Sequence, residues 1–239
     1  MTRFFVGLTG ASGHAYARAL VKALVDAGHA VDLSVTEAGA KVLRHELGID
    51  AGARGERFTG QLAAFAGKER VHALRAFPSD AIEAPPSSGT ALGGGVILCP
   101  CSMGTLSRVS IGFSSNLVER AADVALKEGR KLVLVPRETP LSVVHLENLL
   151  RVARLGATVL PAMPGFYHHP ASVDDLVRHV VGKILDRLGV EHAVSARWKG
   201  LARPAEEAEI ARPVDAATGD PEARPARPRK ARAKRRGGR

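Results

Sequence analysis

Short apolar runs alternate with helical patterns in the first part of the chain. The runs RFFVGL (3–8) and AVDLSVT (30–36) predict two strands. The segment between them predicts a helix over 14–27, because apolar side chains recur there at helical spacing: Ala17, Leu20, Leu24 and Ala27. A second helix is expected at 37–47. Strand and helix in alternation favour a parallel sheet.

The same alternation returns in the second half of the chain. Three apolar runs, each stopped by a proline at 100, 136 or 161, predict buried parallel strands: GVILC (95–99), KLVLV (131–135) and ATVL (157–160). Helices with apolar faces are expected at 115–129, 142–156 and 172–189, the last with Ser172 as its N-cap. Residues 48–95 are less regular, with one strand expected at 71–77 and a loop rich in Pro, Ser and Gly after it. The pattern predicts an α/β fold: a three-layer α/β/α sandwich around a mainly parallel open sheet, flavodoxin-like or Rossmann-like.

Composition divides the chain into two parts. With 239 residues, 45% of them apolar, the chain can bury one substantial core, and we expect one domain at 1–198. The net charge is +10, but residues 224–239 hold nine Lys or Arg and no acid, so the rest of the protein is nearly neutral. We expect 199–239 to be a disordered tail rich in Pro, Ala and Arg, which could bind polyanions weakly.

Other compositional features point to the cytoplasm. No apolar stretch approaches the ~20 residues of a membrane span, and the first strand begins at once, so neither a membrane span nor a signal peptide is expected. Cys99 and Cys101 are two positions apart, and we expect free buried thiols that point the same way. No Cys and His pattern predicts a metal site.

The segments that follow the predicted strands carry the candidate chemistry, since ligands of open parallel sheets bind beyond the carboxyl ends of the strands. TGASG follows the first strand, with Thr9 and Ser12 hydroxyls beside Gly10, Ala11 and a helix start whose free N–H groups would attract phosphate. The segment matches neither a dinucleotide fingerprint nor a Walker A loop, which favours a monophosphate ligand. A tight strand-to-helix turn is the alternative.

Three further strand ends offer similar groups. Thr36 closes the second strand, and PCSMGTLS brings Ser102, Met103, Gly104 and Thr105 to a helix start. PRETP places Arg137 and Glu138 at the same edge, where the guanidinium could bind phosphate and the carboxylate could exchange protons. A capped helix and a surface salt bridge are the structural alternatives. His168 and His169 could act as acid–base groups, but adjacent surface histidines are commoner.

Several longer segments resemble the UbiX-like flavin prenyltransferases: TGASG, CPCSMGTLS, NLVERAADVALKEGRKLVLVPRETPL, HLENLLRVARLGATVLPAMPGFYH and SVDDLVRHVVGKILDRLG. The resemblance covers roughly residues 3–198. It implies an enzyme that joins a dimethylallyl group from dimethylallyl monophosphate to reduced FMN at N5 and C6. The product, prenylated FMN, would serve a UbiD-type decarboxylase.

The resemblance also implies a role for individual residues. The flavin would be held by the strand-end residues Gly10, Ala11, Ser12, Thr36, Ser102, Met103, Gly104, Thr105 and Arg137. The prenyl phosphate would be bound by Arg120, Lys127, Tyr167 and Lys183, with Trp198 closing over the substrate. Glu138 would be the acid–base residue, assisted in proton handling by Ser12 and Glu46. Position in the chain alone would not single out Arg120, Lys127, Tyr167 or Lys183.

The resemblance further implies a homododecamer with the donor site between subunits, and no metal. Cations suit a leaving phosphate, and no Asp-rich magnesium motif is present. The competing hypotheses are a flavin-dependent cysteine decarboxylase, a direct aromatic acid decarboxylase, a flavin carrier, and a nucleic-acid-associated protein acting through its tail.

Overall fold

A single parallel sheet forms the centre of the molecule. The computed structural model describes residues 1–195 and 200. The strands lie in the order β3-β2-β1-β4-β5-β6, and every neighbouring pair is parallel. Their bounds are β1 (Arg3–Leu8), β2 (Ala30–Val35), β3 (Leu74–Phe77), β4 (Val96–Cys101), β5 (Leu132–Pro136) and β6 (Thr158–Val159).

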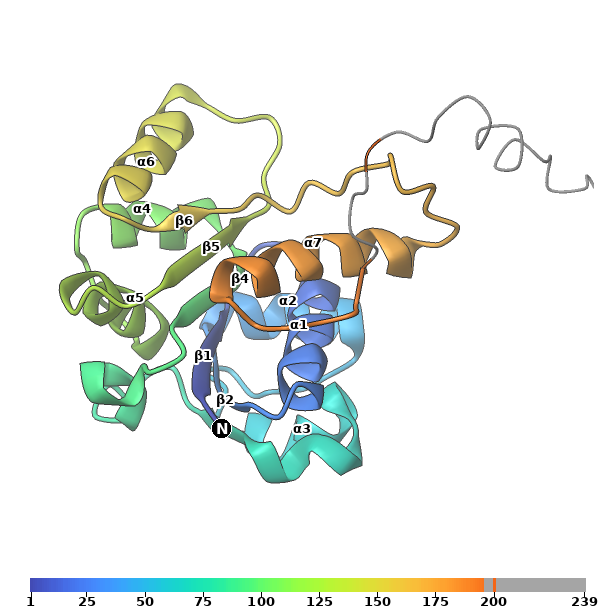
Figure 1. Ribbon diagram of the computed structural model, residues 1–239. Helices are drawn as coiled ribbons and strands as arrows, with labels where there is room; N and C mark the ends of the chain where they lie inside the picture. Colours follow the sequence, from blue (N-terminus) through green and yellow to red (C-terminus); the bar gives the residue numbers. More distant parts are fainter. Residues whose placement is uncertain (196–199, 201–239) are drawn as a thin grey trace, which may run out of the picture. The chain divides into compact units, whose positions relative to one another are not determined.

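Helices cover both faces of this sheet (Figure 1). One face carries α1 (His14–Asp26), α2 (Glu37–Leu47), α3 (Phe58–Ala66) and α7 (Val173–Leu188). The other carries α4 (Met103–Ser110), α5 (Leu117–Lys127) and α6 (Val143–Arg154). Three 3₁₀ turns complete the described part: η1 (Lys68–Ala73), η2 (Pro85–Ser87) and η3 (Gly89–Ala91). The predicted three-layer α/β/α class is confirmed.

Alternation along the strands builds two hydrophobic cores, one on each face. In β1, Phe4, Val6 and Leu8 pack toward the layer of α1 and α7, while Phe5 packs toward that of α4 and α5. Because successive side chains of a strand point to opposite faces, an apolar run such as RFFVGL can serve both cores at once. The strands therefore read as continuous apolar runs.

The irregular segment 48–95 contains a helix that was not predicted. In α3, Phe58, Leu62 and Phe65 are buried at helical spacing, but Gly60 is a poor helix former and weakens the pattern. The strand predicted at 71–77 is limited to β3, because residues 68–73 form η1.

One of the three prolines, Pro100, does not end its strand as predicted. β4 continues through Pro100 to Cys101, and β5 includes Pro136. Cys99 packs in the core under α1, and Cys101 in the core under α4, so the two thiols do not point the same way. The cause is an irregularity in the pairing of β4 with β5 between Leu98 and Cys101. Both cysteines are free and buried, as expected.

The edge at β6 is less buried than the apolar run 157–160 suggests. Both residues of β6 are only half-buried. The neighbouring α6 buries only Val152, and apolar side chains on it remain exposed: Val143, Val144, Leu146 and Leu150. The apolar side of α6 thus lies largely outside the core of the single chain.

The helix ends of α7 match the prediction. Ser172 accepts a hydrogen bond from the Asp175 N–H at 3.2 Å, and Gly189 ends the helix with a positive φ of 76°.

Trp198 lies outside the described residues, as does the predicted tail at 199–239 apart from Gly200. No helix in the described part is long and apolar enough to cross a membrane. Within residues 1–195 and at 200, no group of three His, Cys, Asp or Glu side chains is arranged to hold a metal ion.

Candidate active site

The strand order reverses between β1 and β4, and the two segments of the chain that follow these strands diverge to opposite faces of the sheet. Thr9 joins them. Its Oγ1 donates to the Pro100 carbonyl at 2.8 Å and accepts from the Ser102 N–H at 2.7 Å. Thr9 is fully buried, so its hydroxyl is used within the protein and does not contribute to an open phosphate cradle. It fixes the turn after β1 against the start of α4.

A carboxylate already occupies the start of α1. Glu46 accepts hydrogen bonds from the Gly13 N–H at 3.1 Å and from the His14 N–H at 2.8 Å. The sequence predicted free N–H groups at this helix start, and for these two residues that prediction is wrong. Of the turn residues just before the helix, Ser12 is exposed and Gly10 is half-buried, whereas Ala11 is buried.

Glu46 and its neighbours form a connected polar group. Burial opposes ionisation of Glu46, but hydrogen bonds from the Ser12 side chain and from the His14 and Gly13 N–H groups outweigh it, so its pKa is lowered. The His14 ring is fully buried, with Nδ1 3.6 Å from Glu46 Oε2. Burial lowers the pKa of His14 to about 4, against an opposing effect of Glu46. At neutral pH the group therefore holds an ionised Glu46 beside a neutral His14.

The start of α2 closes tightly on the same turn. Thr36 is the N-cap, and its Oγ1 accepts from the Gly39 N–H at 3.1 Å. A Cβ on Gly10 would lie 2.7 Å from the Ala38 Cβ, and one on Gly39 would lie 2.6 Å from the Leu8 carbonyl oxygen. Gly10 and Gly39 thus allow the close approach of α2 to the end of β1.

The start of α4 provides a second hydroxyl-bearing helix N-terminus. Ser102 caps α4 by accepting from the Thr105 N–H at 3.3 Å, and its hydroxyl donates to Thr105 Oγ1 at 3.1 Å. Met103 is buried, whereas Gly104 is exposed. A Cβ on Gly104 would meet nothing nearer than the Arg108 side chain at 3.8 Å. Packing within the described chain does not require a glycine at position 104. Because glycine has no side chain, the surface at the start of α4 is left open for a ligand.

Arg137 and Glu138 follow β5 at the same sheet edge. Arg137 is half-buried, and its Nε atom is buried with no hydrogen-bond partner in the described residues. A buried guanidinium N–H of this kind can donate to a bound ligand. Glu138 is exposed, and its Oε1 accepts from the Thr139 N–H at 3.0 Å. The carboxylate is therefore accessible to solvent just beyond the end of β5.

Lys127 lies away from this edge, whereas Arg120 is in the first turn of the same helix, α5. Lys127 is the last residue of α5, which runs back toward the amino ends of the strands, over a length of roughly 16 Å. The next residue, Glu128, packs at Gly89, shortly before β4 begins. Arg120 pairs with Asp123 at 3.3 Å and Lys127 with Glu128 at 3.0 Å. Within one chain, Lys127 and Glu138 are at opposite ends of the sheet.

Tyr167 and Lys183, by contrast, are brought to one place. Tyr167 makes edge-to-face contacts with His168 and His179, at ring-centroid distances of 5.6 and 5.4 Å. Lys183 follows His179 by one turn on α7, and the pKa of His179 is lowered by burial first, then by His168 and Lys183. Sequence reasoning missed His179, which looks like an ordinary helix residue. Its position four residues before Lys183 was the available signal.

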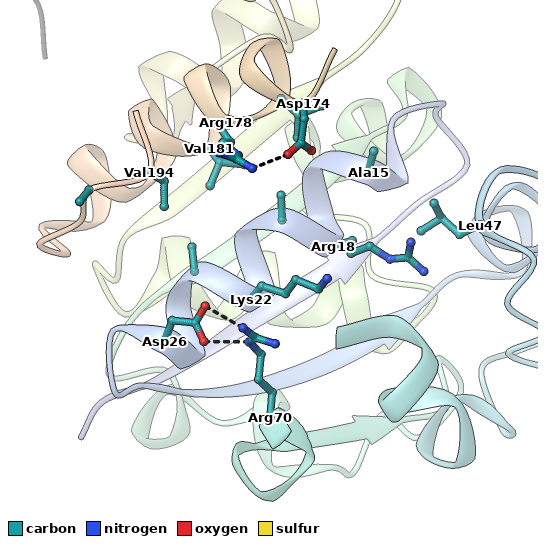
Figure 2. Close-up of a pocket in the computed structure, with 14 residues that line it drawn as sticks. Ala15, Arg18, Lys22, Asp26, Leu47, Arg70, Asp174, Arg178, Val181 and Val194 are labelled. Atoms are coloured by element: carbon teal, nitrogen blue, oxygen red, sulfur yellow. Dashed lines mark hydrogen bonds and ion pairs between the residues drawn. The ribbon is translucent and has the colours of Figure 1, made fainter. Parts of the chain in front are cut away.

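A groove of about 490 Å³ lies along the outside of α1 and α7 (Figure 2). None of the site residues predicted from the sequence lines it. Two ion pairs border it, Arg70 with Asp26 at 2.8 Å and Arg178 with Asp174 at 2.6 Å. Arg18 and Lys22 add two further cations to its lining. The flavin-binding residues predicted from the sequence lie instead at the strand ends, with the capped helix starts and Arg137.

Comparisons with known proteins agree on one family. Residues 1–185 match the family model described as Flavoprotein. A flavin prenyltransferase UbiX from Halalkalibacterium halodurans is 49% identical over 195 residues, which are 82% of this chain and 92% of the relative. One from Pseudomonas aeruginosa is 44% identical over 196 residues, 82% of this chain and 93% of the relative.

Solved structures show the same relationship. A dodecameric FMN-dependent UbiX-like decarboxylase from Escherichia coli O157:H7 superposes with a TM-score of 0.72 at 40% identity, covering 83% of this chain and 100% of that one. A UbiX protein in complex with FMN and dimethylallyl pyrophosphate gives a TM-score of 0.73 at 34% identity, covering 84% and 99%. An FMN-dependent cysteine decarboxylase, with a TM-score of 0.53 at 14% identity, shares the fold alone.

Proposed function

We propose that this chain, which belongs to the UbiX family of flavin prenyltransferases, joins a dimethylallyl group from dimethylallyl monophosphate to reduced FMN at N5 and C6. One observation carries the proposal at the site. The buried, unpartnered Nε of Arg137 and the open surface at Gly104 lie on the strand-end edge where Thr9 joins the turn after β1 to α4. These features fit a flavin phosphate and ring.

The flavin half of the site is built from four strand ends. Gly10, Ala11 and Ser12 would face the flavin from β1, Thr36 from β2 and Arg137 from β5. The α4 start would contribute its capped first turn, Ser102, Met103, Gly104 and Thr105. Helix N-termini attract phosphate, and an arginine can bind it with two N–H groups. When bound, reduced FMN supplies the electron-rich ring atoms that the prenyl carbon joins.

The prenyl half needs cations, because the donor leaves its phosphate as an anion. Arg120, Lys127, Tyr167 and Lys183 would bind this phosphate, and Trp198, outside the described residues, would close over the substrate. Lys127 is at the far end of the sheet from Glu138 in the same chain. A complete donor site therefore requires another copy of the chain, and the exposed apolar side of α6 suits such assembly into a homododecamer.

Three side chains would manage protons. Glu46 holds the Ser12 side chain by a hydrogen bond and is kept ionised by its N–H partners, so the pair can position a proton beside the flavin. Glu138 lies exposed at the mouth of the crevice, where it can exchange a proton with the leaving phosphate or with the flavin.

Phosphate release tests the proposal in its simplest form. Purified protein with reduced FMN should release phosphate from dimethylallyl monophosphate, and should do so only when the flavin is present. Dimethylallyl pyrophosphate in a parallel reaction identifies the donor. Flavin-independent release would indicate a phosphatase and would contradict prenyl transfer.

Direct decarboxylation is the second candidate, because one structural relative is described as an FMN-dependent decarboxylase. Incubation with oxidised FMN and aromatic acids or a C-terminal cysteine peptide separates the two activities. Carbon dioxide release without any prenyl donor would favour the decarboxylase. We expect none, since the phosphate-binding cations have no use in that reaction.

The setting of the reaction follows from the same proposal. Prenylated FMN would pass to a UbiD-type decarboxylase. We place the enzyme in the cytoplasm, where its two buried thiols, whose pKa values burial raises, would stay reduced. The tail at 199–239 would bind polyanions weakly and be dispensable for catalysis. Truncation after Trp198 should leave prenyl transfer intact and remove salt-sensitive polyanion binding.

A further inference from the structure

Two histidine rings stack beside Tyr167. His168 and His179 lie with ring centroids 4.7 Å apart and planes only 4° from parallel. Tyr167 meets both at steep angles, 75° to His168 and 79° to His179. The three rings come from two separate parts of the fold, the loop after β6 and α7, so the stack fixes the loop to the helix.

The two histidines of the stack are shielded from solvent to different degrees, and Tyr167 on their edge is exposed. Both ring nitrogens of His168 are buried with no hydrogen-bond partner in the described residues. His179 is only 7% exposed, and burial, followed by His168 and Lys183, lowers its pKa. Parallel aromatic rings at this separation stack closely. The pair therefore behaves as a flat aromatic platform.

The loop is shaped to fit this platform. A Cβ on Gly165 would lie 2.8 Å from the Tyr167 ring and 3.4 Å from His179 Nε2. A larger residue at 165 would push the tyrosine away from the histidines. Gly165 thus allows the chain to turn closely over the rings.

We propose that His168 and His179 are positioning residues, which hold Tyr167 next to Lys183 so that both reach the phosphate of the prenyl donor. The inference rests on the proposed function, because it takes Tyr167 and Lys183 as the donor's ligands. His179 and Lys183 are one turn apart on the same side of α7, so a tyrosine packed on His179 lies within one helical turn of Lys183. The histidines themselves need not touch the substrate.

Ring shape and ring charge can be separated by substitution. His179→Ala removes the edge-to-face contact, whereas His179→Phe keeps an aromatic ring of similar shape. His169→Asn is the matched control, because His169 is exposed, lies outside the stack and has a positive φ of 50°, which asparagine tolerates. Each protein is loaded with FMN, and binding of dimethylallyl monophosphate is followed by calorimetry alongside KM and kcat.

We expect His179→Ala to weaken donor binding and raise KM by about three- to tenfold, with a smaller change in kcat, as loss of one aromatic contact should. FMN affinity and melting temperature should change little. His179→Phe should restore donor binding, and His169→Asn should match the wild type. Equal losses in the Ala and Phe variants, or an unchanged KM in His179→Ala, would overturn the proposal.

Calorimetry measures donor binding without prenyl transfer, so failure of the positioning role can be distinguished from failure of the proposed function. If wild-type protein binds the donor but transfers no prenyl group, the proposed reaction fails while the positioning role is still measured. If wild-type FMN-loaded protein does not bind the donor at all, both fail.

Discussion

Glu46 and Glu138 are two carboxylates in different surroundings. Glu46 is held by three hydrogen-bond donors at the start of α1, and its pKa is lowered. Glu138 is exposed and has a single local N–H partner at Thr139. The first carboxylate is fixed in place and stays ionised, whereas the second can turn toward a substrate.

Glu138→Gln should slow prenyl transfer by roughly 100-fold or more while FMN affinity stays nearly unchanged, because the amide keeps the volume and loses proton exchange. Single-turnover kinetics and a flavin titration measure the two effects. Glu83→Gln, another exposed carboxylate, is the control. Loss of bound flavin in Glu138→Gln would instead assign this residue to cofactor binding.

His14 should make the protein less stable in acid. Its folded pKa of about 4 is below the ordinary value of 6.5, so between these pH values the unfolded chain binds a proton that the folded chain does not. The free energy of unfolding should fall by roughly 3 kcal/mol as pH drops through this window. His14→Leu should remove that part of the slope in urea denaturation series. Identical slopes in the two proteins would contradict the assignment.

At the scale of elements, the starts of α1, α2 and α4 meet around the ends of β1 and β4. At the α4 start, a Cβ on Gly104 would meet no close neighbour. A Cβ on Gly10, by contrast, would clash with Ala38. The two glycines therefore have different reasons to be glycine. One allows helix packing, and the other leaves room for a ligand.

Gly104→Ala should raise the free energy of unfolding by up to about 1 kcal/mol, since alanine favours the helix and its Cβ meets no neighbour. FMN affinity should nevertheless fall, because the methyl group enters the crevice. Denaturation and flavin titration report the two effects separately. Gly10→Ala is the comparison and should destabilise the apoprotein. Unchanged flavin affinity in Gly104→Ala would mean that the flavin does not approach α4.

The sequence predicted elements better than it predicted contacts. Apolar runs located five strands closely, because buried strands of a parallel sheet are continuous apolar segments of the sequence. The sixth strand, β3, is shorter than the predicted 71–77. The sequence analysis missed α3, where Gly60 weakens the helical pattern. It also missed the continuation of β4 through Pro100. Strand-end motifs singled out candidate residues at the ends of β1, β2, β4 and β5, and their roles stay predictions. The partners of these motifs are remote in sequence, as with Glu46 and Gly13 or Thr9 and Ser102, so local pattern could not reveal them.

At the scale of the whole molecule, the proposed donor-binding and proton-transfer residues of one chain do not all lie at the same end of the sheet. Lys127 and Glu138 are separated by the length of the sheet, and α6 leaves apolar side chains such as Leu146 and Leu150 exposed. Both features fit a symmetric assembly in which neighbouring chains complete each other's site.

Mixed oligomers test this sharing. Lys127→Ala and Glu138→Gln should each be nearly inactive alone, but co-expressed chains should regain a substantial part of the activity, because some sites then draw both intact residues from different chains. The measurement is prenyl transfer by the purified mixed oligomer. No recovery in an oligomer that contains both variants would place the two residues in one chain's site.

The mass of the flavin tests prenyl transfer most directly. Purified protein is incubated anaerobically with reduced FMN and dimethylallyl monophosphate. The flavin is then released and its mass is measured by mass spectrometry. The proposed function predicts a gain of one five-carbon prenyl unit on FMN that depends on Glu138. Flavin of unchanged mass, with the donor bound and the protein folded, would contradict it.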